Sequence, residues 1–202
     1  MYTPKHFLEA DPDELEKLID AYAFGALISN DAGRPFATHV PFLYDRKQSV
    51  LSCHVARANP QWRHFERDPA VLVIFQGPHG YVSPTWYVDP GVPTWDYAVA
   101  HVHGTARAVE DPVAVRAHVE RLAARYEQSN RSPWQPDYDR RKLAGIVGIE
   151  IQITEIEGKF KLSQNRSGAD RASVVAKLNA RGTDTDLALA RLIEAAGARI
   201  KH

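Results

Sequence analysis

Between residues 26 and 56, three short apolar segments alternate with turn sequences, and this alternation limits the fold more than any other feature. The segments cover residues 26–29, 35–44 and 50–56, and Asn30-Asp31-Ala32-Gly33 and Asp45-Arg46-Lys47-Gln48 separate them. Strands joined by such short turns pair antiparallel, because parallel pairing needs a long crossover. The sequence therefore predicts an antiparallel meander at the start of a β-rich domain.

Further strand signals follow in the rest of the chain. The run Ala70-Val71-Leu72-Val73-Ile74-Phe75 is continuously apolar, which is typical of a strand that is buried on both faces or lies in a dimer contact. Residues 96–109 and 146–156 complete a set of six strands. No glycine-rich loop of the Rossmann or P-loop kind is present. We expect a mainly β fold with peripheral helices, a six-stranded antiparallel split barrel rather than a parallel α/β sheet.

Helix signals lie at the margins of this strand pattern. Asp11-Pro12 and Asp111-Pro112 each combine a capping aspartate with proline at the first helical position. Two more helices are expected over residues 170–179 and 184–196. These signals predict two parts, a barrel over residues 1–158 and a basic C-terminal helical segment over residues 159–202 that packs on it.

Charge is balanced overall but not along the chain. Lys plus Arg and Asp plus Glu both total 25, so the formal net charge is zero. Residues 159–202 hold nine basic and four acidic residues, a balance of +5, which leaves −5 for residues 1–158. This segment is either a solvated helical face or a patch for an anionic partner. DNA remains an open partner without a clear motif, because two helices joined by a short turn more often simply pack together.

Several classes of site are excluded by residue counts. Cys53 is the single cysteine, so no intramolecular disulfide and no cysteine-based zinc cluster can form. The start of the chain lacks the apolar core of a signal peptide, and no apolar run approaches the roughly 20 residues that span a bilayer. We expect a cytoplasmic protein that does not enter a membrane. No metal site is expected either, because His101 and His103 share a strand face without a third ligand nearby.

Two segments carry chemistry that suits a phosphorylated, planar ligand. His54, Arg57 and Asn59 lie where a strand end passes into a helix start, where backbone N–H groups and a guanidinium can bind phosphate. The alternative is an Asn59 cap with Arg57 in solvent. Residues 81–97 hold five tyrosines and tryptophans among glycines and prolines, which suits stacking on a heterocycle or filling a core under a long loop. No catalytic triad or close carboxylate pair is recognisable, so catalytic residues are unknown.

The order of these segments resembles the PaiB-like family of FMN-binding negative transcriptional regulators. The motifs that carry the resemblance are Met1-Tyr2-Thr3-Pro4-Lys5-His6-Phe7, Pro35-Phe36-Ala37-Thr38-His39-Val40-Pro41-Phe42, His54-Val55-Ala56-Arg57-Ala58-Asn59-Pro60, Gly80-Tyr81-Val82-Ser83-Pro84-Thr85-Trp86-Tyr87, Val92-Pro93-Thr94-Trp95-Asp96-Tyr97 and Lys161-Leu162-Ser163-Gln164-Asn165-Arg166. The resemblance implies FMN as cofactor, the split barrel of pyridoxamine-phosphate-oxidase-like proteins, and a homodimer with flavin at the subunit interface.

The resemblance also implies roles for individual residues. Thr38, His39, Val40 and Pro41 would lie along the flavin, and His54, Arg57 and Asn59 would lie near its phosphate. Trp86, Thr94 and Trp95 would border the ring or its pocket. Lys161, Gln164 and Asn165 would approach from the partner or from the C-terminal segment.

Relatives of this barrel differ in function, so alternatives stay open beside the regulator. One is a flavin-dependent oxidoreductase of the pyridoxamine-phosphate-oxidase or flavin-reductase kind, in which the cofactor carries the redox chemistry. A weaker one is a haem-binding split-barrel protein, since no axial ligand stands out among the nine histidines. Whether the chain is an enzyme is therefore undecided at this point.

Overall fold

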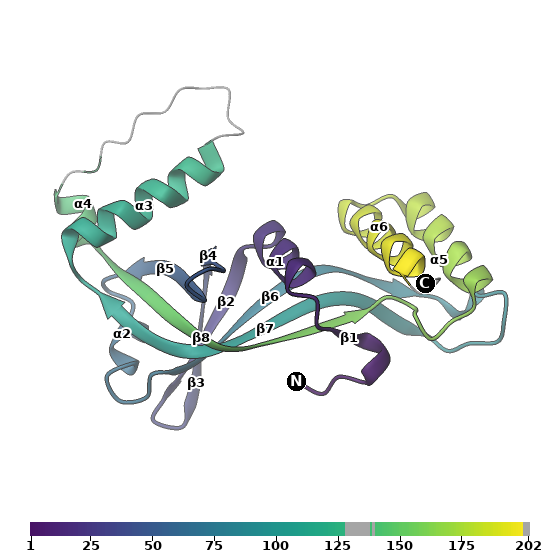
Figure 1. Ribbon diagram of the computed structural model, residues 1–202, viewed down its shortest axis with the longest axis horizontal. Coiled ribbons are helices and arrows are strands. Elements are labelled where there is room, and N and C mark those ends of the chain that lie inside the picture. The colour runs from purple at the N-terminus through teal and green to yellow at the C-terminus, as the bar shows by residue number, and fades with distance from the viewer. Residues whose placement is uncertain (128–137, 139, 200–202) are drawn as a thin grey trace. The chain divides into compact units, whose positions relative to one another are not determined.

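The computed structural model describes residues 1–127, 138 and 140–199 of the chain (Figure 1). The strands in these residues are β1 (Leu8–Glu9), β2 (Phe24–Asp31), β3 (Arg34–Pro41), β4 (Leu43–Asp45), β5 (Val50–Ala56), β6 (Ala70–Val82), β7 (Thr94–Val109) and β8 (Ile146–Lys161). The helices are α1 (Pro12–Ala21), α2 (Gln61–His64), α3 (Pro112–Glu127), α4 (Arg140–Ala144), α5 (Gly168–Arg181) and α6 (Asp184–Arg199), with short 3₁₀ turns η1 (Lys5–Phe7) and η2 (Pro84–Trp86).

The chain divides into two compact units that interleave along the sequence. Unit 1 comprises Met1–Ala21, Gln76–Ala100 and Glu157–His202, and unit 2 comprises Tyr22–Phe75 and His101–Ile156. The three long strands β6, β7 and β8 each contribute one part to either unit. The units are described separately below.

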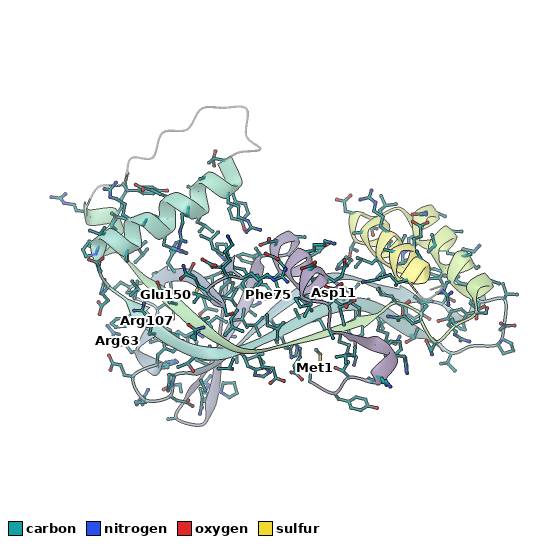
Figure 2. All side chains as sticks on the ribbon, viewed as in Figure 1. Met1, Asp11, Arg63, Phe75, Arg107 and Glu150 are labelled. Atoms are coloured by element: carbon teal, nitrogen blue, oxygen red, sulfur yellow. The ribbon has the colours of Figure 1, made fainter. Side chains whose placement is uncertain are left out.

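Unit 2 is built on the strand order β3-β2-β6-β7-β8-β5-β4. Strand β2 pairs antiparallel with β3 on one side and with β6 on the other, and β5 pairs antiparallel with β8. Alternate side chains point into the core, where Leu27, Val73 and Ile151 are fully buried. Cys53 of β5 is also fully buried, and burial raises the pKa of its thiol. At the surface, Figure 2 labels Arg107 and Glu150, which form an ion pair between β7 and β8.

Unit 1 contains β1 paired antiparallel with the end of β8, helix α1, and the helical hairpin α5–α6 (Figure 1). Gly182 ends α5 with a φ of 73°, a left-handed conformation that glycine adopts without strain. Thr183 then caps α6 by accepting a hydrogen bond from the backbone N–H of Asp186 at 3.2 Å. The core side chains of the two helices are Val174, Leu178, Leu189 and Ile193.

The fold class is as the sequence predicts, mainly antiparallel β with C-terminal helices. The strand count differs, since the described residues form eight strands rather than six. One reason is that the segment over residues 35–44 breaks at Phe42, whose N–H donates to the carbonyl of Ala23 at 2.9 Å, so β3 and β4 are separate. The other is that β1 has two residues, too few to show an alternation. A domain boundary at residue 158 stays a prediction.

Candidate functional site

The residues that the sequence predicts at the flavin fall into two groups, one in each unit. Unit 2 holds Thr38, His39, Val40, Pro41, His54, Arg57 and Asn59. Unit 1 holds Trp86, Thr94, Trp95, Lys161, Gln164 and Asn165.

Strand β3 presents its four predicted residues on two different faces. Thr38 and Val40 point toward one face, where Val40 is buried, whereas His39 and Pro41 point toward the other. On the His39 face, the ring of Phe24 stacks beside the imidazole with 6.4 Å between centroids and 27° between planes. Phe24 is 65% exposed, which is unusual for a phenylalanine in a strand. A flat ligand on one face would therefore meet the side chains of only one of these two pairs.

Asn59 sets the hydrogen-bond polarity of Thr38. The Asn59 Oδ1 accepts from the backbone N–H of Gln61 at 2.9 Å, so its amide nitrogen must point the other way. That nitrogen donates to Thr38 Oγ1 at 3.0 Å. Since Thr38 accepts this bond, its own hydroxyl hydrogen is available to a second acceptor. Asn59 thus positions Thr38, a role that differs from direct phosphate contact.

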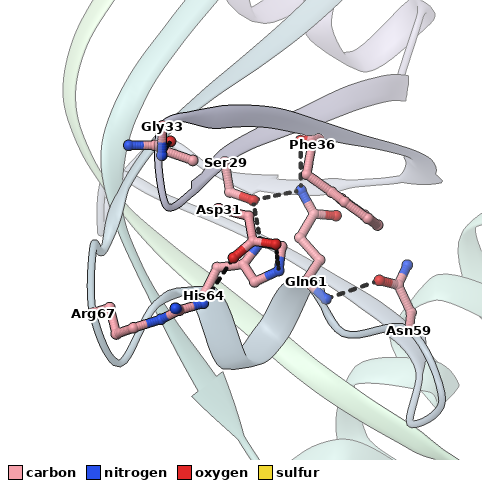
Figure 3. A network of polar contacts seen from close by, with 9 residues as sticks. Ser29, Asp31, Gly33, Phe36, Asn59, Gln61, His64 and Arg67 are labelled. Carbon is pink, nitrogen blue, oxygen red and sulfur yellow. Dashed lines mark hydrogen bonds and ion pairs between the residues drawn. The ribbon is translucent and has the colours of Figure 1, made fainter.

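Gln61 organises the polar network behind this strand (Figure 3). The side chain is fully buried, and its Nε2 donates to the carbonyl of Leu27 at 2.9 Å, to Ser29 Oγ at 3.2 Å and to the carbonyl of Phe36 at 3.3 Å. These bonds tie α2 to β2 and β3. Sequence reasoning missed Gln61, because a glutamine at a helix start gives no sign of being buried.

The network continues from Ser29 to the surface (Figure 3). Ser29 Oγ accepts from Gln61 and lies 3.0 Å from His64 Nδ1, so it links these two side chains by hydrogen bonds. The other imidazole nitrogen lies 3.8 Å from Asp31, which also pairs with Arg67 at 2.8 Å. The α2 segment is therefore anchored to β2 through the side chains of Gln61 and His64.

Arg57 is held by three parts of unit 2 at once. Its Nε donates to the carbonyl of Ala144 at 2.8 Å, one terminal nitrogen to Glu110 at 2.5 Å, and the other to the carbonyl of Ile146 at 3.2 Å. Together with Glu110, Pro112, Val115 and Leu143 it lines a cavity of about 360 Å³. Arg57 therefore fastens the β5–α2 loop to the start of β8. Phosphate binding by Arg57 stays a prediction.

His54 pairs with a second histidine that the sequence did not single out. Its Nδ1 lies 3.2 Å from Nε2 of His118 on α3. Burial lowers the pKa of both imidazoles, and for His118 the neighbouring His54 and Arg121 lower it further, to about 4. The pair is therefore uncharged near neutral pH. No local signal could have found this contact, because the two residues are 64 positions apart.

In unit 1, Lys161 is fixed by a buried carboxylate. Its Nζ lies 3.3 Å from Asp96 Oδ1, which has no exposed surface, and donates to Thr94 Oγ1 at 2.6 Å and to the carbonyl of Trp95 at 2.5 Å. Ser163 donates to the other Asp96 oxygen at 2.6 Å. Burial raises the pKa of the Asp96 carboxyl, while the hydrogen bond from Ser163 and the charge of Lys161 oppose that shift.

This arrangement also sets the polarity of Thr94. A lysine ammonium can only donate, so Thr94 Oγ1 must accept and its hydrogen is available to another acceptor. Trp95 beside it is 55% exposed, and its ring lies 6.1 Å from that of Tyr81 and 6.4 Å from that of His79. Thr94 and Trp95 therefore offer a donor next to an exposed aromatic surface.

The remaining predicted residues of unit 1 have mixed environments. Gln164 closes a tight turn, since it accepts from the N–H of Leu162 at 2.6 Å and donates to the carbonyl of Phe160 at 2.5 Å. Asn165 is exposed. Trp86 is half-buried, with the guanidinium of Arg181 5.2 Å from its ring centroid.

Much of the positive charge of the C-terminal segment is paired within unit 1. Arg181 binds Asp186, Arg166 lies 3.7 Å from Asp170, and Arg199 lies 3.3 Å from Glu9. Asp170 in turn accepts from the N–H groups of Val88 and Asp89, which fastens the aromatic loop to α5. Asp170 and Asp186 already count in the balance of +5, so among the described ion pairs only those of Lys161 with Asp96 and of Arg199 with Glu9 and Glu14 offset that excess.

The donor set of these residues fits FMN. In unit 1, Thr94 has a hydroxyl hydrogen to offer beside the exposed ring of Trp95. In unit 2, Thr38 offers a hydroxyl hydrogen on one face of the sheet, and Phe24 presents an exposed ring on the other. Flavin carbonyls and a phosphate are acceptors, and a flat ring system stacks on aromatic side chains. The residues present therefore match the groups that FMN carries.

Residues 1–155 match the protein family described as "Putative FMN-binding domain". The chain belongs to this FMN-binding family. It is 35% identical over 202 residues to the protease synthase and sporulation protein PAI 2 of Bacillus subtilis, a match that covers 96% of this chain and 97% of that protein. It is 30% identical over 205 residues to the uncharacterised protein AN0679 of Emericella nidulans, covering 80% of this chain and 82% of that protein.

Solved structures show the same fold at low sequence identity. The flavocytochrome Anf3 of Azotobacter vinelandii has a TM-score of 0.64 at 12% identity, covering 83% of this chain and 73% of that one. The FAD and haem binding protein of Mycobacterium smegmatis has a TM-score of 0.63 at 17% identity, covering 77% of this chain and 73% of that one. At these identities the likeness is one of fold alone.

Membership of the FMN-binding family confirms the cofactor that the sequence predicts, and the split-barrel fold is confirmed as well. The roles of individual residues toward FMN stay predictions. Among the described residues, no helix is long and apolar enough to span a bilayer, and no group of three or more histidine, cysteine or acidic side chains is arranged to hold a metal ion.

Proposed function

We propose that this protein is an FMN-binding homodimer that acts as a regulator of the PaiB type. The support for regulation is the likeness to PAI 2 of Bacillus subtilis, which extends over nearly the whole length of both chains. The support for FMN contact by Thr38 in unit 2 and by Thr94 in unit 1 is their hydrogen-bond polarity. FMN would be held by donors, and no side chain of the protein is assigned a catalytic step.

The observation that carries the dimer is an apolar sheet face in unit 2. On β2 the residues Phe24, Ala26 and Ile28 point to one side. The register places Ile74 and Leu72 of β6 opposite Ala26 and Ile28, and Pro41, His39 and Ala37 of β3 opposite Phe24, Ala26 and Ile28. Residues directly opposite in a sheet share a face.

This face remains partly open to solvent. Phe24 is 65% exposed, and Ile28, Leu72 and Ile74 are half-buried, whereas their neighbours Leu27 and Val73 are fully buried. Contiguous apolar surface of this kind marks an interaction site. A second copy of the chain can cover it with the same face, as two-fold symmetry requires. A stable interface would bury on the order of 2,000 Å² in total.

Light scattering with flavin absorbance tests the dimer and the cofactor together. We expect the purified protein to carry flavin bands and to have the mass of a dimer at micromolar concentration. Ile74→Lys should shift the mass toward the monomer and release flavin, because a charge would be buried in the interface. Val113→Lys is the matched control, since Val113 is 76% exposed on α3. A stable monomer that binds FMN would contradict the proposal.

The regulator can be tested through its salt dependence on DNA. In α5 and α6, Lys177 and Arg191 are exposed and have no acidic partner among the described residues. Affinity of full-length protein for a promoter fragment should fall with salt, and the double variant Lys177→Gln, Arg191→Gln should lower the slope by about two. Equal slopes would exclude these helices as the DNA contact.

A flavin-dependent oxidoreductase is the second candidate. The pairing of Arg166, Arg181 and Arg199 with carboxylates favours it, because these three cations are then not available to DNA phosphates. Anaerobic addition of NADH or NADPH decides between the two. Rapid bleaching of the flavin bands supports a reductase, and an unchanged spectrum together with DNA binding supports the regulator.

A further inference from the structure

The histidine pair His54 and His118 lies where helix α3 packs on the sheet of unit 2. His54 is on β5 and half-buried, whereas His118 on α3 is 6% exposed. Their rings are 5.3 Å apart at 74°. Gly148 on β8 pairs with His54, and a Cβ there would lie 3.6 Å from Val115 of α3. Helix α3 thus packs at van der Waals distance over Gly148, next to the position where the two imidazoles meet.

The contact between the two rings requires one proton between the two nitrogen atoms that face each other, His54 Nδ1 and His118 Nε2. Two neutral imidazoles hold two protons on four nitrogens, and each ring has one donor and one acceptor. With 3.2 Å between His54 Nδ1 and His118 Nε2, one of these atoms donates and the other accepts. Only two arrangements are consistent with that. Either His118 donates and His54 carries its proton on Nε2, or His54 donates and His118 carries its proton on Nδ1.

The surroundings of His118 favour the first arrangement. His118 Nδ1 is buried and has no hydrogen-bond partner among the described residues. In the second arrangement this atom would be a buried N–H without an acceptor, which is rarer in proteins than an unpaired acceptor. Arg121 also contributes a positive charge near this ring.

Other charged groups do not reverse this preference. Arg121 and Glu150 both line the small cavity beside His118, but Glu150 is already paired with Arg107 on β7. The Cys53 thiol, which also lines this cavity, is kept neutral because burial raises its pKa. Arg121 is thus the unbalanced charge at this end of the pair.

We propose that His118 is a positioning residue that fixes His54 in the tautomer with the proton on Nε2, so that His54 donates a hydrogen bond to the FMN phosphate. This inference rests on the proposed flavin site. His54 Nε2 has no hydrogen-bond partner in the described part of the chain, so the donor is available to a ligand. The same logic holds at Thr38 and Thr94, where the neighbouring Asn59 and Lys161 donate and leave the threonine hydroxyl hydrogen to a ligand.

Nitrogen-15 NMR of the FMN-bound full-length protein reads the tautomer directly. Selective loss of signals in His54→Gln assigns the ring. We expect a protonated Nε2 and an unprotonated, hydrogen-bonded Nδ1 on His54 in the wild type. A protonated His54 Nδ1 would overturn the inference, whatever the protein does with flavin.

Two variants of His118 test the consequence for the ligand. His118→Leu removes the donor, and the ratio of FMN to riboflavin affinity should fall about tenfold, because a hydrogen bond to a charged acceptor is worth about 1.4 kcal/mol or more. His118→Gln retains an amide donor and should keep most of the ratio. If both variants behave like the wild type, His118 does not act through His54.

The two proposals can fail separately. If wild-type protein binds riboflavin as tightly as FMN, the phosphate contact of the proposed site is wrong, and with it the role of His54 as its donor. The NMR spectrum still decides whether His118 sets the tautomer. If both variants lose FMN and riboflavin equally, the effect is structural and the inference is overturned.

Discussion

The two units support their predicted flavin residues by different physical means. In unit 2, Thr38 depends on amide groups, with Asn59 and the buried Gln61 forming a network of neutral hydrogen bonds. In unit 1, Thr94 depends on an ion pair between Lys161 and the buried Asp96. Both supports leave a hydroxyl hydrogen for a ligand. They differ in what their loss costs, because an uncompensated buried charge is far more expensive than an unpaired amide.

The largest effect should come from breaking the ion pair of unit 1. Asp96→Ala leaves the Lys161 ammonium and the Ser163 hydroxyl without their buried partner, and should lower the free energy of unfolding by about 3–5 kcal/mol. Urea unfolding without added flavin measures this. Asp89→Ala, on an exposed side chain of the same unit, should change it by less than about 0.5 kcal/mol. Equal losses of stability in the two variants would show that the burial of Asp96 is not the cause of the effect.

The next effect is the pH dependence of stability that His118 of unit 2 should cause. The pKa of His118 is lowered to about 4 in the folded protein from an ordinary 6.5, so the unfolded chain binds its proton first on acidification. The contribution of His118 to the free energy of unfolding is fully present above pH 6.5 and is lost as the pH falls toward 4. This loss amounts to about 3 kcal/mol. His118→Leu should flatten the stability curve in that range. Parallel curves for wild type and variant would contradict the burial of a neutral imidazole.

A smaller effect is expected in the neutral network of unit 2. Gln61→Leu leaves the carbonyls of Leu27 and Phe36 and the hydroxyl of Ser29 without their donor, and should cost about 1–3 kcal/mol. Gln152 also donates to two carbonyls, those of Gln48 and Ser49, but it is exposed. Gln152→Leu should therefore be close to neutral, since water replaces its bonds. A similar loss in both variants would mean that burial is not the cause.

The smallest effect belongs to an exposed ion pair at the edge of that network. Arg67 and Asp31 are 2.8 Å apart, with side chains 65% and 43% exposed. Arg67→Met should lower stability by less than about 1 kcal/mol, and added salt should reduce the difference further. Denaturant midpoints at low and high salt measure it. A loss as large as that of Asp96→Ala would show that charge alone, rather than buried charge, governs these supports.

The sequence predicts the parts of this molecule that depend on neighbours along the chain. Strand β5 spans Val50–Ala56 and helix α3 begins at Pro112, both as expected, because alternation and capping are local signals. The strand break at Phe42 was missed, since it depends on a bond to Ala23 across the sheet. The predicted boundary was therefore wrong where a backbone group distant in the sequence determines it.

The candidate site was harder to predict than the fold. Motif resemblance drew attention to Thr38, Arg57 and Lys161, but the groups that control them are distant in sequence or carry no motif. Asp96 lies 65 residues before Lys161, and Glu110 lies 53 residues after Arg57. Whether a charged side chain meets solvent, a ligand or a buried partner is decided by such contacts. A count of charges along the sequence cannot contain that information.

The single cysteine allows the local opening of the native fold to be measured. Cys53 has no exposed surface and lies in the middle of β5, so a thiol reagent can reach it only when this part of unit 2 opens. The rate of its modification in native buffer therefore reports the free energy of that opening without any engineered label. Ligands that bind the folded form and not the opened form should slow the modification of Cys53 in proportion to their occupancy. The modification rate therefore also measures ligand binding.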